Sequence, residues 1–267
     1  MQQQLPIVNS TIKGVKNLLT KGVFMISVCM ATYNGEKYIR QQLDSILPQL
    51  AENDEIVISD NDSTDNTIDI IKSYNDNRIK LLSYKCDRTK LKNKLKRDKN
   101  ITNNFENSLK ECKGDIIFFS DQDDIWFPNK VIDQLPLLEK YDLVMSNATL
   151  IDGNGNITRN QLYDKNPLRR GLLSFRARGC LSAVTRELVD VSLPFPKTAF
   201  SHDLWLTTLA EYRHSYYFLN KQLVYHRRGI GNASFDVTQK STNSLAFRIY
   251  YRLELLIDGL LRYLKIR

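Results

Sequence analysis

Residues 26–36 read ISVCMATYNGE, a short and mostly apolar run followed at once by polar residues. A run of this length and composition predicts a buried strand that ends near Ala31. The apolar residues that come next recur at helical spacing and predict a helix: Ile39, Leu43, Ile46, Leu47 and Leu50. The order strand, polar loop and helix is the repeating unit of an α/β fold.

The same alternation continues along the chain. Four further apolar runs predict strands: 55–60, 79–83, 116–119 and 143–145. Helical patterns lie between them: a helix through Ile68 and Ile71 capped by Ser63 or Thr64, a helix over 103–112 ended by Gly114, and a helix over 131–141. This order indicates right-handed βαβ units and a Rossmann-like, mainly parallel sheet flanked by helices.

Polar and acidic residues follow three of these strands at the point where each strand ends. The three segments are 32–36, 60–62 and 121–124. The carboxyl ends of parallel strands meet at one edge of a sheet, where α/β proteins bind ligands. Strand-end loops are often polar and Asp favours turns, but this explains one acidic cluster better than three on one edge. The sequence therefore predicts a binding site at this edge.

The composition limits the class of protein. The chain has 267 residues, with 38 Lys plus Arg against 30 Asp plus Glu and a formal net charge of +8. The charge suits a phosphate-bearing substrate, a polyanion or an anionic membrane. Four cysteines without metal or disulfide spacing indicate a reducing, cytosolic compartment. No apolar run reaches the roughly 18 residues of a spanning helix, and residues 1–24 are expected to form an arm or a short amphipathic helix without a secretory pattern.

Two segments have unusual charge patterns. Residues 85–99 contain 8 Lys or Arg against 2 Asp, and we expect a mobile loop there, either a solvated stretch or a flap over a ligand. Residues 241–267 predict a basic amphipathic helix, which either packs on the domain or attaches to an anionic membrane surface. One face holds Ile249, Leu253, Leu256, Ile257, Leu260 and Leu264, and the other holds Arg248, Arg252, Asp258, Arg262 and Lys265.

The third acidic segment has the composition of a metal site. An extended backbone turns Asp121 and Asp123 to the same side. Carboxylate oxygens suit Mg²⁺ or Mn²⁺, which commonly bind one or two carboxylates together with substrate phosphates. A metal there would neutralise the charge of a departing diphosphate. The pattern therefore predicts a site for a diphosphate-bearing substrate.

Four segments together resemble glycosyltransferase family 2, in its rhamnosyltransferase-like branch. They are ISVCMATYNGEKYI at 26–39, DNDSTDNT at 60–67, FFSDQDDIW at 118–126 and HDLWL at 202–206. The resemblance covers about residues 25–234 in the family's order. It implies the GT-A fold and an inverting enzyme that uses nucleotide-diphosphate sugars and usually a divalent metal.

The resemblance assigns donor-binding roles to residues of the first two loops. Thr32, Tyr33 and Glu36 would line the nucleotide pocket. Asp60 and Asn61 would lie near the base. The family usually has a second Asp where this chain has Asn61, so base recognition would be weaker or altered. It usually has Gly at position 62, where Asp tolerates a left-handed backbone better than most residues do.

The resemblance also assigns roles at the other motifs. Asp121 would approach the ribose or the donor sugar, and Asp123 would bind the metal that holds the diphosphate. Gly179 and Cys180 match a segment beside the sugar pocket. Asp203 matches the catalytic base, a role that suits inversion because the acceptor hydroxyl must lose its proton. Taken alone, without the other motifs, Asp203 is better explained as an acid favoured by the dipole at a helix start.

A second departure from the family lies near the end of the catalytic region. The family often has a His before Gly-Asn, whereas this chain reads YHRRG at 225–229. Either His226 takes that role as a metal ligand through a shift in register, or an arginine, Arg227 or Arg228, contacts the diphosphate directly.

These observations favour a GT-A domain over 25–240, with a nucleotide-binding half at about 25–125 and an acceptor half at about 126–240. The implied donor is dTDP-rhamnose or a UDP-sugar. The implied acceptor is a lipid-linked bacterial surface polysaccharide, such as capsule or O-antigen, at the inner face of the cell membrane. The alternatives are a nucleotide-sugar-binding protein without catalysis and a basic nucleic-acid-binding module. No aromatic residue interrupts the basic run at 85–99, so we expect no nucleic-acid partner.

Overall fold

The computed structural model describes residues 24–91, 94–168, 177–228 and 245–264. The strands are β1 (Ile26–Thr32), β2 (Glu55–Asp60), β3 (Ile79–Ser83), β4 (Ile116–Asp121), β5 (Ile125–Trp126), β6 (Leu143–Ile151), β7 (Ile157–Arg159), β8 (Ser182–Thr185) and β9 (Tyr216–Arg227). The helices are α2 (Ile39–Ile46), α3 (Thr67–Ser73), α4 (Lys94–Glu111), α5 (Lys130–Gln134), α6 (Arg186–Ser192), α7 (His202–Tyr212) and α8 (Leu245–Leu264). The predicted arm at 1–24 lies outside the described residues, except for Phe24.

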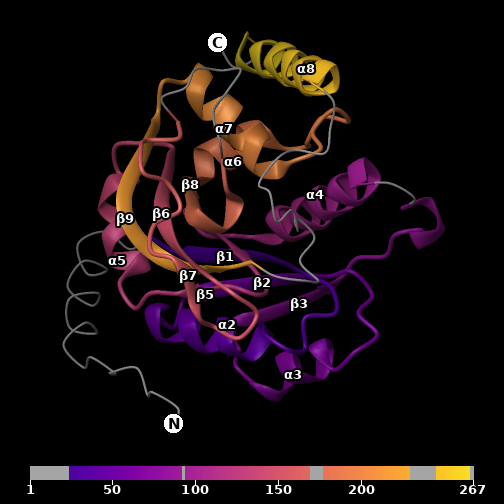
Figure 1. Ribbon diagram of the computed structural model, residues 1–267, viewed down its shortest axis with the longest axis vertical. Helices are drawn as coiled ribbons and strands as arrows, with labels where there is room; N and C mark the ends of the chain where they lie inside the picture. Colours follow the sequence, from indigo (N-terminus) through magenta and orange to yellow (C-terminus); the bar gives the residue numbers. More distant parts are fainter. Residues whose placement is uncertain (1–23, 92–93, 169–176, 229–244, 265–267) are drawn as a thin grey trace.

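The described strands form a single sheet in the order β3-β2-β1-β4-β8-β6-β9-β5, with β7 beside β6. Helices α2 and α3 cover one face of the sheet, and α4, α6 and α7 cover the other (Figure 1). Helix α8 lies outermost, beside α7. The α/β class predicted from the sequence is confirmed.

The first four strands of this order form a parallel half-sheet with its carboxyl ends aligned. Thr32 of β1 pairs with Asp60 of β2, and Ala31 of β1 pairs with Asp121 of β4. The three polar loops therefore start side by side, as the sequence predicts. Their strands are buried along almost their whole length because helices cover both faces.

The other half of the sheet is mixed and returns the chain to the same edge. Strand β8 is antiparallel to β4 and β6, while β9 is parallel to β6 and antiparallel to β5. The long, curved β9 ends at the loop that follows β4 (Figure 1). Because Ile125 pairs with Tyr225, the next residue of β9, His226, lies opposite Asp124.

Helix α4 begins at Lys94, well before the predicted start at residue 103. The expectation of a loop over all of 85–99 is therefore wrong for residues 94–99. Lys99 accounts for part of the difference, because its Nζ donates hydrogen bonds to the carbonyl oxygens of Pro196 at 3.1 Å and Ala199 at 2.8 Å. A lysine with such partners can lie on a packed helix.

Two other elements differ in length from their predictions. Helix α5 ends at Gln134 instead of residue 141, and the chain continues as a 3₁₀ turn that contains Pro136. Proline has no N–H for the next helical hydrogen bond. Strand β6 continues to Ile151 instead of residue 145, and all its residues are buried. Its polar residues are accommodated because neighbours bond them, as Tyr163 does to Asn147.

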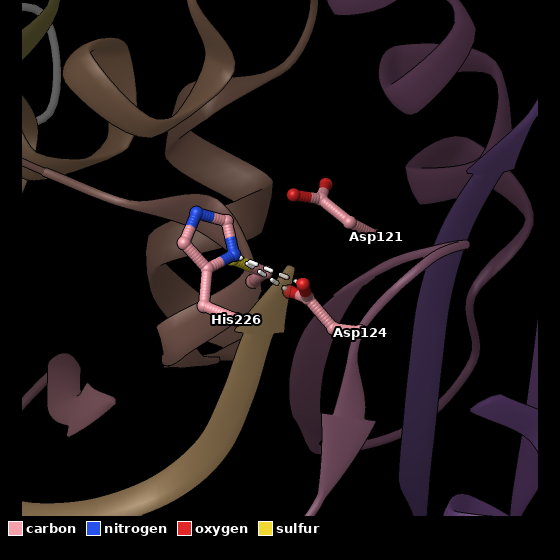
Figure 2. A group of neighbouring side chains, drawn as sticks. Asp121, Asp124 and His226 are labelled. Carbon is pink, nitrogen blue, oxygen red and sulfur yellow. Dashed lines mark hydrogen bonds and ion pairs between the residues drawn. The ribbon is translucent and has the colours of Figure 1, made fainter. Parts of the chain in front are cut away.

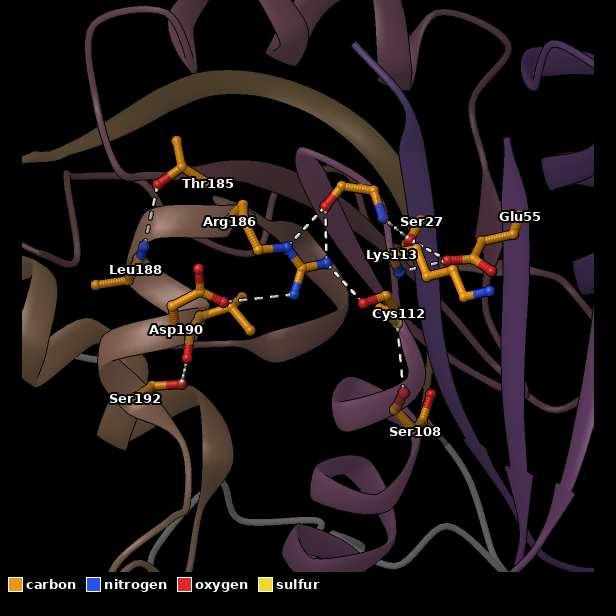
Figure 3. Close-up of polar contacts among 12 residues, drawn as sticks. Ser27, Glu55, Ser108, Cys112, Lys113, Thr185, Arg186, Leu188, Asp190 and Ser192 are labelled. Atoms are coloured by element: carbon orange, nitrogen blue, oxygen red, sulfur yellow. Dashed lines mark hydrogen bonds and ion pairs between the residues drawn. The ribbon is translucent and has the colours of Figure 1, made fainter. Parts of the chain in front are cut away.

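Arg186, the first residue of α6, ties this helix to the segment that follows α4 (Figure 3). Its guanidinium donates to the carbonyl oxygens of Cys112 at 2.7 Å and Gly114 at 2.7 Å, just past the end of α4. Gly114 was predicted to end α4, but the helix ends at Glu111. A side chain at 114 would come within 2.5 Å of the Ser27 backbone nitrogen, so the close passage of β1 requires this glycine.

Helix α8 is amphipathic as predicted, but it packs through residues of its predicted polar face. Gly259 lies against Tyr212 of α7, Asp258 accepts a hydrogen bond from Thr198, and Arg262 donates to the Leu193 carbonyl oxygen at 2.8 Å. The opposite, apolar side is exposed, with 44% to 59% exposure at Ile249, Tyr250, Leu253, Ile257, Leu260, Leu261 and Leu264. Among the described residues, no helix combines the length and apolarity needed to cross a bilayer.

Candidate active site

Side-chain hydrogen bonds tie the first loop to the other two at the carboxyl edge. The Gln122 amide accepts from the Tyr33 backbone N–H at 2.9 Å and donates to the Tyr33 carbonyl at 3.0 Å. The Glu36 carboxylate accepts from the backbone N–H and side-chain amide of Asn66 at 3.0 and 2.8 Å. Of the three residues predicted to line the nucleotide pocket, Thr32 is buried and Tyr33 is 39% exposed, whereas Glu36 holds the loops together.

Asp60 organises the second loop from a buried position. Its carboxylate accepts from the Thr32 hydroxyl at 2.7 Å and from the Ser63 N–H and hydroxyl at 2.8 and 2.6 Å. The neighbouring Asn61 is buried as well. Asp62 adopts a left-handed conformation, with φ of 58°. It stands at the position where the family usually has glycine. Asp60 therefore joins the end of β1 to the second loop.

The predicted cap of α3 is wrong. The residue at the cap position is Asn66, which makes no side-chain cap bond. Ser63 donates to Asp60, and the Thr64 N–H donates to the Asn34 side-chain oxygen at 2.9 Å. Contacts between the loops therefore use the hydroxyl residues that sequence reasoning assigned to the helix.

Four side chains of types that can bind a metal ion lie together where β4 ends. Figure 2 labels three of them: Asp121, Asp124 and His226. One donor atom from each of Asp121, Asp124, Cys180 and His226 lies within 4.8 Å of the others. Asp121 is partly exposed, and the other three are buried. The carboxylates of Asp121 and Asp124 turn toward the His226 ring. We call this group the four-donor cluster.

Asp124 is the member of the cluster that sequence reasoning missed. It is fully buried, and its oxygens lie 2.9 and 3.1 Å from His226 Nδ1. It also accepts from the Arg227 backbone N–H at 2.9 Å. Burial by itself would raise the pKa of Asp124, but His226 and these hydrogen bonds lower it below the usual value. The sequence signal that could have identified Asp124 is its position directly before the short apolar strand β5.

The other two carboxyls of this loop lack comparable compensation. Burial raises the pKa of Asp121 to about 6, and the charge of Asp124 adds to the effect. Burial and the charges of Asp124 and Asp121 also raise the pKa of Asp123. His226 pairs with only one of the three acids. The loop therefore carries excess negative charge, which fits a bound divalent cation.

Asp203 lies in the first turn of α7 with its carboxylate held in place. One oxygen accepts from the Gly179 N–H at 3.3 Å, and the other accepts from the Ser201 hydroxyl. A Cβ at Gly179 would come within 2.2 Å of His202 Nε2, so glycine permits the close approach of α7. These contacts orient the predicted base.

The same segment connects Asp203 to the four-donor cluster. Gly179, which contacts Asp203, directly precedes Cys180 of the cluster. The charge of Asp203 is also one cause of the raised pKa of Asp121. The structure therefore brings the predicted base, the predicted sugar-pocket residues and the acidic loop together.

The two arginines after His226 have different surroundings. Arg227 donates to the carbonyl oxygens of Asp123 at 2.8 Å and Asp152 at 3.1 Å, and it lies 4.4 Å from the centre of the Tyr38 ring. These contacts make Arg227 a structural residue.

Arg228 interacts electrostatically with the acidic loop. Burial lowers its pKa, as does the charge of Arg178, while Asp121 and Asp124 act in the opposite direction. Both arginines therefore adjoin the acidic loop, Arg227 through hydrogen bonds and Arg228 through its charge.

A buried lysine beneath the acidic loop was not predicted. Lys130 is fully buried, and its Nζ donates to the Gln134 side-chain oxygen at 2.8 Å. It lies 5.2 Å from the centre of the Trp126 ring. Burial lowers the pKa of Lys130 to about 7.

Comparison with known families identifies the fold and the class of activity. The sequence model for Glycosyl transferase family 2 matches residues 27–190, which include all three polar loops and Cys180. The chain belongs to glycosyltransferase family 2. Of the three functions that the sequence left open, the glycosyltransferase is therefore the correct one.

Curated relatives agree with this assignment. The Escherichia coli UDP-Glc:alpha-D-GlcNAc-diphosphoundecaprenol beta-1,3-glucosyltransferase WfgD is 27% identical over 256 residues, which are 90% of this chain and 95% of WfgD. The Shigella flexneri dTDP-rhamnosyl transferase RfbG is 36% identical over 128 residues, 47% of this chain and 40% of RfbG. The second match supports the resemblance to the rhamnosyltransferase-like branch.

Solved structures show the same fold. Staphylococcus aureus TarS, residues 1–349 in complex with UDP-GlcNAc, aligns with a TM-score of 0.59 at 18% identity over 90% of this chain and 73% of TarS. Mycobacterium tuberculosis glucosyl-3-phosphoglycerate synthase with Mn²⁺, UDP-glucose and phosphoglyceric acid aligns with a TM-score of 0.56 at 19% identity, covering 97% and 86%. The predicted GT-A fold is confirmed.

Proposed function

We propose that this family 2 protein is an inverting, metal-dependent enzyme with a nucleotide-diphosphate sugar as its donor. The acceptor is a hydroxyl of a growing, lipid-linked bacterial surface polysaccharide. The observation that carries this proposal is the convergence of Asp203 with the excess negative charge of the 121–124 loop. The relatives support both substrate classes, since WfgD is named for UDP-Glc and a diphosphoundecaprenol acceptor, and RfbG for dTDP-rhamnose.

In this mechanism Asp203 is the general base. The acceptor hydroxyl attacks the anomeric carbon from the side opposite the leaving diphosphate, so the configuration inverts. Asp203 takes the hydroxyl proton as the new bond forms. Its hydrogen bonds from Gly179 and Ser201 hold one orientation of the carboxylate, which limits the entropy lost when the acceptor binds.

The donor occupies the edge formed by the three polar loops. Asp121 and Asp123 would hold Mg²⁺ or Mn²⁺, which would neutralise charge on the departing diphosphate. Arg228 adds a positive side chain near the same place. Tyr33 lies exposed at the nucleotide side of the site. The nucleotide pocket is shaped by four neighbouring residues: Thr32, Glu36, Asp60 and Asn61. The sugar is bordered by Gly179 and Cys180. The solved TarS and synthase complexes contain UDP or UDP-sugars, and one contains Mn²⁺, which supports this placement.

The test uses the purified chain with Mn²⁺, UDP-glucose, UDP-GlcNAc and dTDP-rhamnose, and a GlcNAc-diphospholipid acceptor. We expect one donor to raise the melting temperature and to support transfer. The Asp203→Asn variant should lose transfer while it keeps the donor-induced melting shift. Asp164→Asn is the matched control, because Asp164 is an exposed surface acid paired with Arg159. Transfer by Asp203→Asn at the normal rate would refute its role as base.

We also propose that α8 attaches the enzyme to the cytoplasmic face of the bacterial membrane. The exposed apolar row on α8 supports this, since its packing against α7 leaves that row uncovered by the described residues. Residues 245–267 include 5 Arg or Lys against 2 acids, which suits an anionic leaflet. Such attachment would place the active site near a lipid-linked acceptor.

Sedimentation with vesicles that contain anionic lipid tests the attachment. We expect the intact chain to bind, and the Leu253→Gln/Ile257→Gln/Leu260→Gln variant to stay in the supernatant. Ile157→Gln is the matched control, since Ile157 is 57% exposed on β7. Equal sedimentation of the triple variant and the intact chain would refute α8 as the contact, and so would an intact chain that does not bind.

A further inference from the structure

The four-donor cluster has a composition unlike that of a Mg²⁺ or Mn²⁺ site. It combines the thiol of Cys180 and the imidazole of His226 with the carboxylates of Asp121 and Asp124. Magnesium and manganese favour oxygen ligands, whereas sulfur and imidazole nitrogen favour zinc-like ions. Asp123, the metal ligand implied by the family, is not a member of the cluster.

The distances between donors suit a small tetrahedral site. Zinc bonds of 2.0–2.3 Å set neighbouring donors about 3.3 to 3.6 Å apart. His226 Nδ1 and Cys180 Sγ are 3.6 Å apart, which already fits. His226 Nδ1 and the nearer Asp124 oxygen are 2.9 Å apart, as a hydrogen bond requires, so they need to separate by roughly half an ångström.

The elements that supply the donors make this a preformed site. Asp121 ends β4, Asp124 precedes β5, Cys180 lies in the turn Gly179–Leu181, and His226 lies near the end of β9. The pairing of β5 with β9 and the antiparallel pairing of β8 with β4 hold these segments in register. Asp121 is the one member of the cluster that is partly exposed.

We propose that Asp121, Asp124, Cys180 and His226 form a binding site for a thiophilic divalent ion of the zinc class. On binding, Cys180 releases its thiol proton to solvent. The proton that His226 Nδ1 donates to Asp124 moves to Nε2 of the neutral ring, and Nδ1 bonds the metal in place of Asp124. The site shares Asp121 with the donor-metal site of the proposed function. A zinc-class ion therefore competes with donor and Mn²⁺, a consequence that rests on that proposed function.

Cobalt(II) tests the site directly because it occupies zinc sites and absorbs light. A thiolate–cobalt bond gives a charge-transfer band in the near ultraviolet, and a tetrahedral site gives intense visible bands. We titrate the metal-free full chain with Co²⁺ and expect both features at one equivalent. Zn²⁺ should remove them and Mg²⁺ should not.

Variants of two cysteines distinguish this site from chance binding to a thiol. Cys180→Ser should abolish the charge-transfer band and weaken Zn²⁺ binding at least tenfold. Cys86→Ser is the matched control, because Cys86 is the one cysteine of the chain that is not buried. His226→Gln provides a second disruption, and circular dichroism verifies the fold of each variant.

The outcomes are decisive for the cluster. No charge-transfer band with the intact chain, or a band that survives in Cys180→Ser, would overturn the proposal. These readouts need neither donor nor acceptor, so they do not depend on the proposed function. Conversely, if UDP did not raise the melting temperature of the intact chain, this would count against the donor site. The cobalt result would be unaffected.

Discussion

Two groups of acidic side chains lie at the same edge of the sheet in very different surroundings. In the first group, the oxygens of Asp60 and Glu36 accept hydrogen bonds from neighbouring loop residues. In the second group, the carboxyls of Asp121 and Asp123 are crowded together, and their pKa values are raised. Acids with hydrogen-bond donors around them build the site, whereas acids that repel each other are available for a cation.

The largest expected effect follows from neutralising an acid of the crowded group. Asp123→Asn should lower transfer at least a hundredfold, because an oxygen ligand for the donor metal is lost. Its melting temperature should stay the same or rise, since a buried charge that repels its neighbours is removed. Transfer assays and thermal melting measure the two effects. A normal transfer rate would remove Asp123 from the metal site.

An acid of the hydrogen-bonded group should behave in the opposite way. Asp60→Ala removes the acceptor for Thr32 and Ser63 and leaves their donors buried, which should cost about 2 kcal/mol of unfolding free energy. Urea unfolding measures this loss. Unchanged stability would show that the loop holds its shape without Asp60 and would break the contrast between the groups.

The pH dependence of stability separates the groups further. The pKa of Asp121 is raised from 3.8 to about 6 in the folded chain, so between these values the folded state binds more protons than the unfolded state. The contribution of Asp121 to stability is therefore greatest below pH 4 and falls as pH rises toward 6. The intact chain should lose about 2 kcal/mol relative to Asp121→Asn between pH 4.5 and 6.5.

Urea unfolding of both proteins at the two pH values gives this difference. A difference that stays constant with pH would contradict the raised pKa. Added Mn²⁺ should reduce the pH dependence, because the cation favours the ionised carboxyl.

The smallest effect concerns the link between the loops. Gln122→Ala removes both hydrogen bonds to the Tyr33 backbone, which should cost about 1 kcal/mol of unfolding free energy. Donor binding should weaken as well, since the first loop loses its tie to the acidic loop. Urea unfolding and a melting titration with UDP measure the two changes. Unchanged values of both would show that the loops are independent.

Much of the architecture follows from local sequence patterns. Apolar runs predict the parallel strands, and polar residues at their ends predict the edge where the loops meet, as the pairing of Thr32 with Asp60 confirms. Element ends were harder to predict. Helix α4 starts early because Lys99 donates hydrogen bonds to carbonyl groups that are distant in the sequence. Helix α3 lacks its predicted cap because the Ser63 hydroxyl donates to Asp60 instead.

The sequence was sufficient for the family motifs and for most candidate site residues, because these depend on residue type and short spacing. It was not sufficient for the Asp124–His226 contact, which joins residues 102 positions apart. Nor did it reveal that Lys130 is buried or that the apolar row of α8 faces outward. Burial and charge compensation arise from neighbours that only long-range packing brings together, so these features depend on the folded chain.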